Sequence, residues 1–428
     1  MVANLEYSLS KPQVYESKRI QLTSQILHIG SAVSQLSPFE YVATGSRVYL
    51  PNSDLLAQGL YHRGKLQEYI RRIENREEIT PLLKETFGNN WQTQKFNNES
   101  LFPATKTLRK WTDQKITDLR PMIRNGFGQL YIPGSSIKGA IRTAIAYHLL
   151  KYSDKYHVPQ PQKISEVEKT LRYRLDKGNL KSAKNQKKAD DKLFMESLFS
   201  DFSLNYQGKP ARGKTSLPNT DFMRAVRVTD SEPLLESQAK NKQGKPIYRN
   251  LPVVTEVIVS SRFLDRKAKY KCSLYVEMVW QVKTEFTITI NPEMLSWFRH
   301  NQGMEIPFEN IDDILNICQE FAQDQWEAEA FYWEGIKNNP NGQGKTLDFS
   351  NIRSLYSSEN CPFNLRIGWG SGMLGTTIDL LLDEELVEEI RDTCGLEAPN
   401  FEAPKSRRTV VSAKGEIKYV PGWIKFRF

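Results

Sequence analysis

The sequence predicts an α+β protein with a ferredoxin-like or RNA-recognition-type core, long insertions and a glycine-rich loop. Its candidate elements run in the order strand, helix, paired strands, helix, strand, which is the order of that fold class. Helices do not alternate with parallel strands, and no segment repeats at a fixed period. We assign a core to residues 1–290, with inserted segments near 55–125 and 151–215. Residues 291–428 complete this core or form a degenerate second unit.

The core opens with a strand and a hairpin. Residues 18–29, KRIQLTSQILHI, have the apolar spacing of a strand that closes on a Gly-Ser pair. Strands over 39–43 and 48–50 flank the turn at 44–46. Helical spacing with many charges follows over 54–86, and residues 87–118 are polar and rich in loops.

The segment IPGSSIKGAIRTAIAYHLL, residues 132–150, predicts a helix with one apolar side. A Pro-Gly turn leads into it, and Ser135 or Ser136 can cap its first turn. From Ile137 onward, apolar residues recur at helical spacing, so this side of the helix belongs to the core.

Packing does not explain the polar side of this helix. Lys138 and Arg142 are four residues apart and therefore share one face. The unpaired N–H groups at the start of a helix carry partial positive charge and favour an anion such as phosphate. The segment therefore predicts either a phosphate-binding helix start, formed by Ser135, Ser136, Lys138 and Arg142, or an ordinary capped core helix.

The remainder of the chain alternates strands with a few helices. We expect a basic helix–loop element over 170–192, a loop over 204–220, strands over 222–234, 250–264 and 271–290, a helix over 308–337, a strand at NLRIGW, an acidic helix over 382–392, a loop near residues 399–404 and a final strand at PGWIKFRF. The basic element is either a solvated face or an RNA contact. Paired acids at 312–313 and 383–385 are expected to be solvated or to interact with a helix dipole.

The net charge of the chain indicates which class of partner it binds. The 428 residues include 59 Lys and Arg against 50 Asp and Glu, and this net charge of +9 is typical of proteins that bind nucleic acid. No apolar run is long enough to span a bilayer and no signal-peptide core opens the chain, so we expect a cytoplasmic protein without a membrane partner. The four cysteines form no CxxC pair and the five histidines no HxxxH pair, so we expect no metal site and no cofactor.

Two glycine-containing motifs resemble nucleotide fingerprints and fail in detail. In GSSIKGAIR the lysine precedes the second glycine instead of following it. The GKT at 344–346 lacks the first glycine of a phosphate loop, because Asn339 occupies that position. Residues 370–375 contain GxGxxG, but the 53 residues that follow are too few for a dinucleotide-binding domain.

The same glycine-rich segment, RIGWGSGMLGTT, has the composition of an RNA-backbone contact. Its glycines are Gly368, Gly370, Gly372 and Gly375. Without a Cβ, glycine lets a phosphodiester approach the backbone amides closely. Arg366 can pair with a phosphate and Trp369 can stack on a base. The alternative is a tight buried crossing of two backbone segments.

Five short segments together give the chain a family resemblance. They are HIGS at the end of the first strand, IPGSSIKGAIR, FMRAVRVTDSEP, GWGSGMLGTT and the closing PGWIKFRF. From about residue 18 to the C-terminus the chain resembles the RAMP (Cas7-like) proteins of type III CRISPR effector complexes. It is most similar to the Csm-family subunit at the end of the complex that holds the 3′ side of the crRNA. Residues 55–125, 151–215 and 335–360 carry no part of this resemblance.

The resemblance implies a protein that holds the crRNA backbone with its first helix and its glycine-rich loop. The implied partners are crRNA, other Cas proteins including a Cas7-like backbone subunit, and target RNA, in a ribonucleoprotein that supports crRNA maturation and antiviral defense. The cleaving subunits of the family carry an aspartate after the first strand, within a segment resembling GGxDxPVxR. This chain has SAVSQLSPFEYV there, without an aspartate, so we assign no catalytic residues.

Three functions stay open at this point. The first is a non-catalytic, crRNA-binding capping subunit. The second is a RAMP endoribonuclease that cuts target RNA or processes crRNA through an unrecognised group such as His28 or Glu40. The third is a protein scaffold whose glycine-rich loop packs against a neighbouring subunit. For the first function, we expect loss of Lys138 and Arg142 to lower crRNA affinity and to weaken its dependence on salt.

Overall fold

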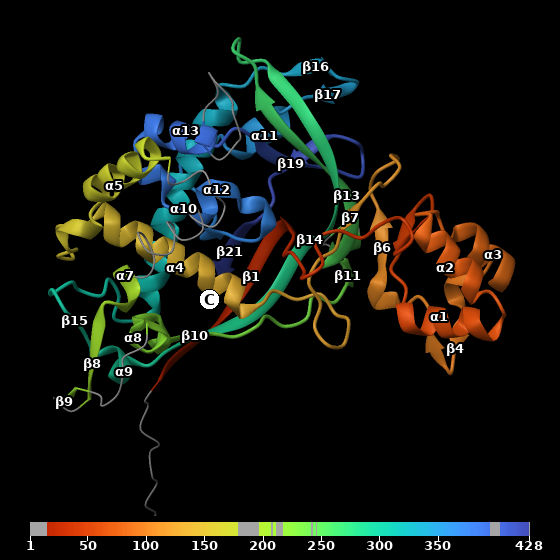
Figure 1. Ribbon diagram of the computed structural model, residues 1–428, viewed down its shortest axis with the longest axis horizontal. Helices are drawn as coiled ribbons and strands as arrows, with labels where there is room; N and C mark the ends of the chain where they lie inside the picture. The colour runs from red at the N-terminus through yellow and green to blue at the C-terminus, as the bar shows by residue number, and fades with distance from the viewer. Residues whose placement is uncertain are drawn as a thin grey trace, which may run out of the picture.

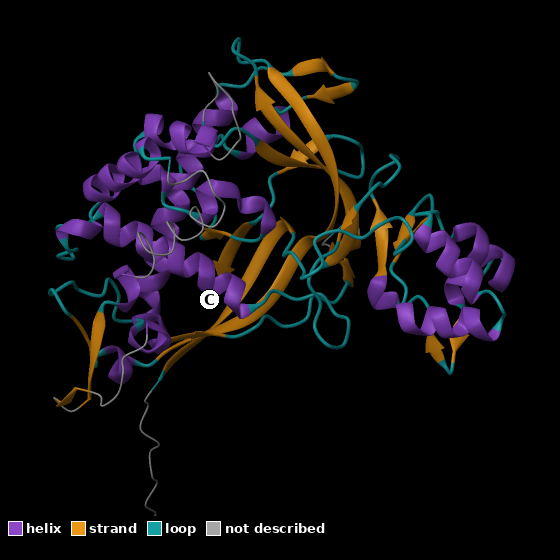
Figure 2. Ribbon diagram, viewed as in Figure 1, coloured by secondary structure: helices purple, strands orange, loops and turns teal. Residues whose placement is uncertain are grey.

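A twelve-stranded sheet organises the computed structural model, which describes residues 15–178, 197–206, 209–210, 217–240, 243–244, 246–393 and 403–427. Most helices cover one side of this sheet, and a small helical unit projects beyond its opposite end (Figure 1). Figure 2 shows that helices and strands are largely segregated in space. The large sheet with packed helices agrees with the predicted α+β class.

The centre of the sheet is antiparallel. Its strands are β1 (Glu16–Leu27), β13 (Leu251–Arg262), β14 (Ala268–Ile290), β18 (Leu365–Arg366) and β21 (Trp423–Arg427). The spatial order is β18-β21-β1-β14-β13, so the first strand lies between β21 and β14. The C-terminal region therefore completes the sheet that the first strand begins.

Shorter strands extend the sheet at its edges. They are β2 (Val42–Ala43), β3 (Arg47–Tyr49), β6 (Thr107–Lys110), β7 (Leu119–Arg120), β10 (Val226–Val228), β19 (Arg407–Val411) and β20 (Ile417–Tyr419). The predicted hairpin is confirmed by the β2–β3 pair, although its first strand is shorter than 39–43. The β19–β20 hairpin was missed, because the Pro-containing approach to it reads as a loop.

Two long helices, α4 (Gly134–Lys151) and α10 (Ile311–Glu334), pack on one face of the central strands. Further helices on the same side are α5 (Ile164–Asp176), α11 (Ser350–Leu355), α12 (Gly372–Thr376) and α13 (Glu384–Thr393) (Figure 1). Ile20 and Phe286 from the sheet and Ile141 and Phe321 from the helices lie in one buried cluster. Alternation along the strands therefore directs their apolar side chains toward the helices.

Residues 53–100 form a separate helical unit beside the sheet (Figure 1). It comprises α1 (Ser53–His62), α2 (Leu66–Glu74), α3 (Thr80–Phe87), β4 (Lys95–Phe96) and β5 (Glu99–Ser100). Its side chains share a small core with Val42 of β2 and with Leu101 and Phe102, which follow the unit in the chain. The Asn52 amide donates to the Leu101 carbonyl at 2.9 Å, so the two ends of the unit are adjacent. The strands β6 and β7, within the expected 55–125 insertion, return to the large sheet.

The remaining described elements are short. They are α7 (Ser197–Ser200), α8 (Leu217–Thr220), α9 (Pro292–Leu295), β8 (Phe202–Tyr206), β9 (Lys209–Pro210), β11 (Ser237–Lys240), β12 (Pro246–Arg249), β15 (Phe298–His300), β16 (Asn339–Gly342) and β17 (Lys345–Leu347). The GKT at 344–346 lies at the β16–β17 hairpin, so it is not a phosphate loop before a helix.

Three expectations need correction or fall partly outside the described residues. The strand expected over 222–234 begins instead with a 3₁₀ turn at Phe222–Ala225, followed by β10. The loop expected over 204–220 includes strand and helix residues, and 207–208 and 211–216 lie outside the described part. Residues 179–192 of the expected basic element at 170–192 also lie outside the described part of the chain.

Candidate nucleic-acid interface

The start of α4 is capped by a carboxylate from another segment. Its N-cap residue is Pro133, with extended backbone and no side-chain cap. The Gly134 N–H donates to Asp230 Oδ1 at 2.8 Å. The expected capping by Ser135 or Ser136 is therefore wrong, because the helix begins one residue earlier and Asp230 supplies the negative partner that a helix start favours. Ser135 itself is exposed and Ser136 is partly exposed.

Lys138 and Arg142 share one face of α4, as their spacing predicts, but that face meets protein. The Lys138 ammonium donates to the carbonyl oxygens of Met223 and Val226 at 2.9 and 2.8 Å. Arg142 forms an ion pair with Asp221 at 2.6 Å. Burial lowers the pKa of Lys138. Both cations therefore fasten α4 to the segment that leads into β10.

The glycine-rich loop crosses the end of β1 at close range. Gly368 has φ 83°, and a Cβ there would lie 2.3 Å from the carbonyl oxygen of His28. A Cβ on Gly370 would lie 2.2 Å from Pro421. At these two positions glycine is required by a tight crossing of backbone segments. Gly372, with φ 67°, faces open space, whereas a Cβ on Gly375 would meet Ser371 at 2.7 Å.

Arg366 points into the protein. It is 4% exposed, and its guanidinium donates to Glu329, to the Pro421 carbonyl and to the Gly370 carbonyl at 3.3, 3.3 and 3.2 Å. Burial by itself would raise the pKa of Glu329, but the charges of Arg407 and Arg366 bring that pKa below its usual range. The expected phosphate contact by Arg366 needs correction, because its guanidinium holds the loop from the inside.

Trp369 lies at the centre of a group of cationic side chains. The Arg408 guanidinium lies 4.3 Å from the centre of the indole and donates to the Trp369 carbonyl at 2.9 Å. Arg120 lies 5.4 Å from the indole, and the His28 ring meets it edge-on at 5.7 Å. We call His28, Arg120, Trp369 and Arg408 the arginine cluster. The ring expected to stack on a base is thus already in contact with two guanidinium groups.

The charge of the arginine cluster is not neutralised within the described residues. No carboxylate there forms an ion pair with Arg120 or Arg408, and the Arg120 Nε atom is buried without a hydrogen-bond partner. Burial, together with the positive charges of Arg120 and Arg366, lowers the pKa of Arg408. Two guanidinium groups that share a site without an acid attract an anionic ligand.

The arginines of this cluster were missed in the sequence. Arg120 lies in a short strand between loops, and Arg408 lies in RRTVV, whose apolar alternation would have predicted a strand. The two motifs that were identified do meet, since α4 contacts β18 and α12. They therefore lie close together, although several of their charged side chains point inward.

The two groups considered for catalysis have structural partners. His28 is 2% exposed, and its Nδ1 atom lies 2.7 Å from the Glu277 carbonyl oxygen. Burial lowers the pKa of His28. Glu40 lies in a turn before β2, where its carboxylate accepts a hydrogen bond from the Ser37 amide at 2.7 Å. In the described part of the chain, no three His, Cys, Asp or Glu side chains are grouped as metal ligands.

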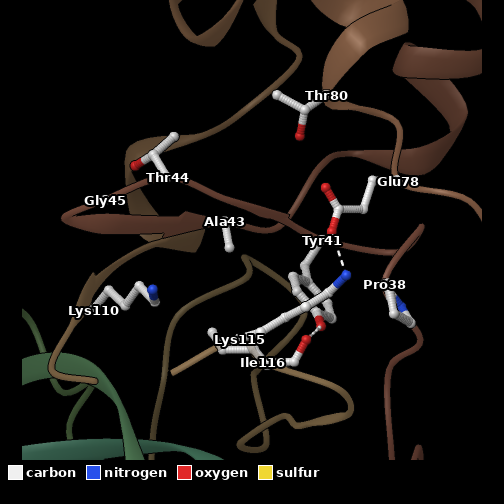
Figure 3. Close-up of a pocket in the computed structure, with 10 residues that line it drawn as sticks. All are labelled: Pro38, Tyr41, Ala43, Thr44, Gly45, Glu78, Thr80, Lys110, Lys115 and Ile116. Carbon is white, nitrogen blue, oxygen red and sulfur yellow. Dashed lines mark hydrogen bonds and ion pairs between the residues drawn. The ribbon is translucent and has the colours of Figure 1, made fainter. Parts of the chain in front are cut away.

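A hollow of about 320 Å³ lies between the β2–β3 hairpin and the helical unit (Figure 3). Lys115 and Glu78 form an ion pair across it at 3.2 Å, and the Tyr41 hydroxyl donates to the Ile116 carbonyl at 2.8 Å. None of its lining residues belongs to the predicted site. Across the described ranges, no helix has the length and hydropathy needed to cross a bilayer.

Most of the sequence matches the model of a known protein family, and the match ends before the glycine-rich loop. Residues 19–357 match the family model of the RAMP superfamily, and the chain belongs to this superfamily.

Two curated relatives are both called "CRISPR system Cms protein Csm5". The protein from Enterococcus italicus is 28% identical over 154 residues, which is 30% of this chain and 44% of that protein. The protein from Methanocaldococcus jannaschii is 24% identical over 343 residues, which is 76% of this chain and 68% of that protein. The chain thus spans less than half of the first relative and about two thirds of the second.

Two solved structures share the fold. One is a chain from the cryo-EM structure of a Csm-crRNA-target RNA ternary complex in a type III-A CRISPR-Cas system, with a TM-score of 0.61, 23% identity and coverage of 96% of this chain and 100% of that chain. The other is the crystal structure of T. onnurineus Csm5, with a TM-score of 0.55, 20% identity and coverage of 95% and 100%.

Proposed function

We propose that this chain is a non-catalytic, crRNA-binding subunit of a type III, Csm-type CRISPR effector ribonucleoprotein. In this role it caps the complex at the 3′ side of the crRNA and supports crRNA maturation and antiviral RNA interference. Membership of the RAMP superfamily and the shared name of both curated relatives support the proposal. Its partners are crRNA, a Cas7-like backbone subunit and target RNA, and its place of action is the cytoplasm.

A ferredoxin-like core is part of this proposal. If β1, β13, β14 and β21 are the first to fourth strands, their spatial order is fourth, first, third, second, with antiparallel neighbours. The helix α4 falls between the first two strands in the chain, and α10 falls between the last two. The core then includes strands from both sides of residue 290, with residues 53–100 as an insertion.

The arginine cluster is the observation that carries the proposed RNA contact. Arg120 and Arg408 bind phosphate, because they are the guanidinium groups beside the glycine-rich loop that lack an acid partner among the described residues. The exposed Ser135, the partly exposed Ser136 and the backbone near Gly372 complete the contact. We assign a positioning role to Lys138, Arg142, Arg366, Gly368, Trp369, Gly370 and Gly375.

The test is the salt dependence of crRNA binding by the full-length chain carrying both Arg120→Gln and Arg408→Gln. Loss of two phosphate contacts should lower crRNA affinity and reduce the slope of log affinity against log salt by about 1.4, since each contact to a single strand contributes about 0.7. Fluorescence anisotropy with labelled crRNA at several salt concentrations measures both quantities.

Two control variants distinguish residues that contact RNA from residues that only hold the fold in position. Arg76→Gln removes an exposed cation from the helical unit and should leave the slope unchanged. Lys138→Met leaves two carbonyl oxygens without their donor, so it should lower the melting temperature while retaining the slope. An unchanged slope in the doubly substituted chain, or a purified wild-type complex without nucleic acid, would contradict the proposal and favour a protein scaffold.

A further inference from the structure

A group of aromatic side chains lies on the sheet outside the arginine cluster. We call Trp111, Tyr248, Trp280 and Tyr419 the aromatic face. All four are partly exposed, and all pack against one buried cluster formed mainly by β13 and β14. Partly exposed Trp and Tyr side chains are enriched at interaction sites, because each combines an apolar ring with a polar group.

The two indoles at the centre of the aromatic face are arranged edge to face. The ring centres of Trp111 and Trp280 are 5.5 Å apart, with an angle of 69° between the ring planes. The Tyr419 hydroxyl lies beside the Trp280 indole, and burial raises the pKa of this tyrosine. An edge-to-face pair covers a face of one ring only, so the partly exposed indoles retain surface for a further stacking partner.

The aromatic face and the arginine cluster lie on the same side of the sheet. Trp369 packs against the same buried cluster as the four aromatic residues. Arg120 is paired with Val276 of β14, and Trp280 lies four residues further along the same strand. Even spacing places Val276 and Trp280 on one side of the sheet, about 13 Å apart.

The charges on this surface are distributed unevenly. Near the aromatic face, Arg109 lies 4.6 Å from the Tyr248 ring centre and forms an ion pair with Glu236 at 2.7 Å. At the other end, Arg120 and Arg408 have no carboxylate partner among the described residues. A ligand that fits both ends carries its negative charge at the arginine cluster and a flat apolar group beside Trp280.

We propose that the aromatic face stacks the bases of a single-stranded RNA whose phosphates are bound by Arg120 and Arg408. Unneutralised cations combined with accessible aromatic rings are the pattern of sequence-tolerant single-strand binding. An apolar protein surface would use the rings but would leave the two guanidinium groups without anions. This inference rests on the proposed function and adds to it a second contact, away from the glycine-rich crossing.

The first experiment locates the RNA on the wild-type chain. The full-length protein is irradiated at a wavelength absorbed by nucleic acid in the presence of a single-stranded oligouridylate, and it is then digested with trypsin. We expect an adduct on peptide 272–283, CSLYVEMVWQVK, with the fragment spectra placing it on Trp280. Adducts found exclusively on peptides without a residue of the aromatic face would overturn the inference. This measurement does not depend on the folding of any variant.

The second experiment measures the contribution of the ring. Trp280→Leu should weaken binding of the same oligouridylate about tenfold, and Trp280→Phe should recover most of that loss because it retains an aromatic ring. Phe331→Leu is the matched control, since Phe331 is 75% exposed on α10, outside the aromatic face. Thermal melting of each variant identifies any loss of folding.

The outcomes separate this inference from the proposed function. The stacking inference fails and the proposed function stands if three results are found together. Wild-type protein binds crRNA, the doubly substituted arginine chain shows the reduced salt slope, and Trp280→Leu binds oligouridylate as tightly as wild type. If the wild-type chain binds neither crRNA nor oligouridylate, both fail. A Trp280 adduct together with recovery by Trp280→Phe supports both.

Discussion

Arg366 and Arg408 both contact the glycine-rich loop, and their surroundings give them different roles. Arg366 is enclosed by Glu329 and two carbonyl oxygens, so its charge stabilises the folded chain. Arg408 is stacked on Trp369 and has no acid partner among the described residues. Removing Arg366 would take away one of the positive charges that balance the buried Glu329 carboxylate, and this would strongly destabilise the folded chain. Removing Arg408 should affect binding more than folding.

The buried histidine beside this loop predicts a dependence of stability on pH. Burial lowers the pKa of His28 below 6.5, and those of His148 and His300 are lowered in the same direction. As the pH falls through about 6.5, the unfolded chain gains protons that the folded imidazoles do not accept, so the free energy of unfolding decreases. Chemical denaturation at pH 7.5 and 5.5 measures the effect.

A histidine substitution assigns part of this effect to one residue. His28→Gln should show a smaller decrease in the free energy of unfolding between these pH values than the wild type, because His148 and His300 still contribute. An equal decrease in both proteins would show that His28 does not take part.

At the scale of elements, α4 joins the core to the candidate interface. Its apolar side packs with α10 and the sheet, while Lys138 and Arg142 fasten its other side to residues 221–226. Its first residue is held close to the end of β10, since a Cβ on Gly134 would lie 2.3 Å from the Val228 carbonyl oxygen. The position of this helix start is therefore fixed by backbone contact.

Two glycines in α4 should respond in opposite directions to the same substitution. Gly134→Ala introduces a Cβ into the Val228 backbone and should lower the free energy of unfolding by about 1–3 kcal/mol. Gly139→Ala meets nothing within 4 Å in the helix interior and should raise it by about 0.5–1 kcal/mol. Urea denaturation of both variants checks the pair. A stable Gly134→Ala protein would contradict the close approach.

At the scale of the whole molecule, the helical unit of residues 53–100 has a buried cluster that it shares with Val42, Leu101 and Phe102. The central sheet and the helices α4 and α10 share a different buried cluster, and the arginine cluster lies beside the end of β1. Because the Asn52 and Leu101 backbones are hydrogen-bonded, the chain leaves and re-enters the sheet at one place. The architecture therefore predicts that this unit can be removed without opening the sheet.

Replacing residues 53–100 with a short Gly-Ser linker should preserve one cooperative unfolding transition and crRNA binding. The melting temperature should fall by several degrees, because the variant exposes Val42, Leu101 and Phe102, which pack against the helical unit. Circular dichroism and the anisotropy assay measure these properties. Loss of the cooperative transition would show instead that the unit is part of the main folding core.

The sequence by itself determined most elements and their order. The strand at KRIQLTSQILHI, the helix after IPGSS, the β13 and β14 strands and the helix α10 were all predicted, because apolar periodicity is a local signal. The glycine content of the loop also indicated that a Cβ is not tolerated there, and a tight crossing of two backbone segments was one of the two explanations that it allowed. The contacts that Gly368 and Gly370 make agree with that reading.

Only the tertiary structure decided which charges are neutralised. Spacing places Lys138 and Arg142 on one face, but it does not reveal that carbonyl oxygens and Asp221 lie opposite them. Arg120 and Arg408 are far apart in the chain and meet at Trp369 through strand pairing and the loop crossing. The energy of a charge depends on its neighbours in space and on its exposure, and sequence periodicity carries neither.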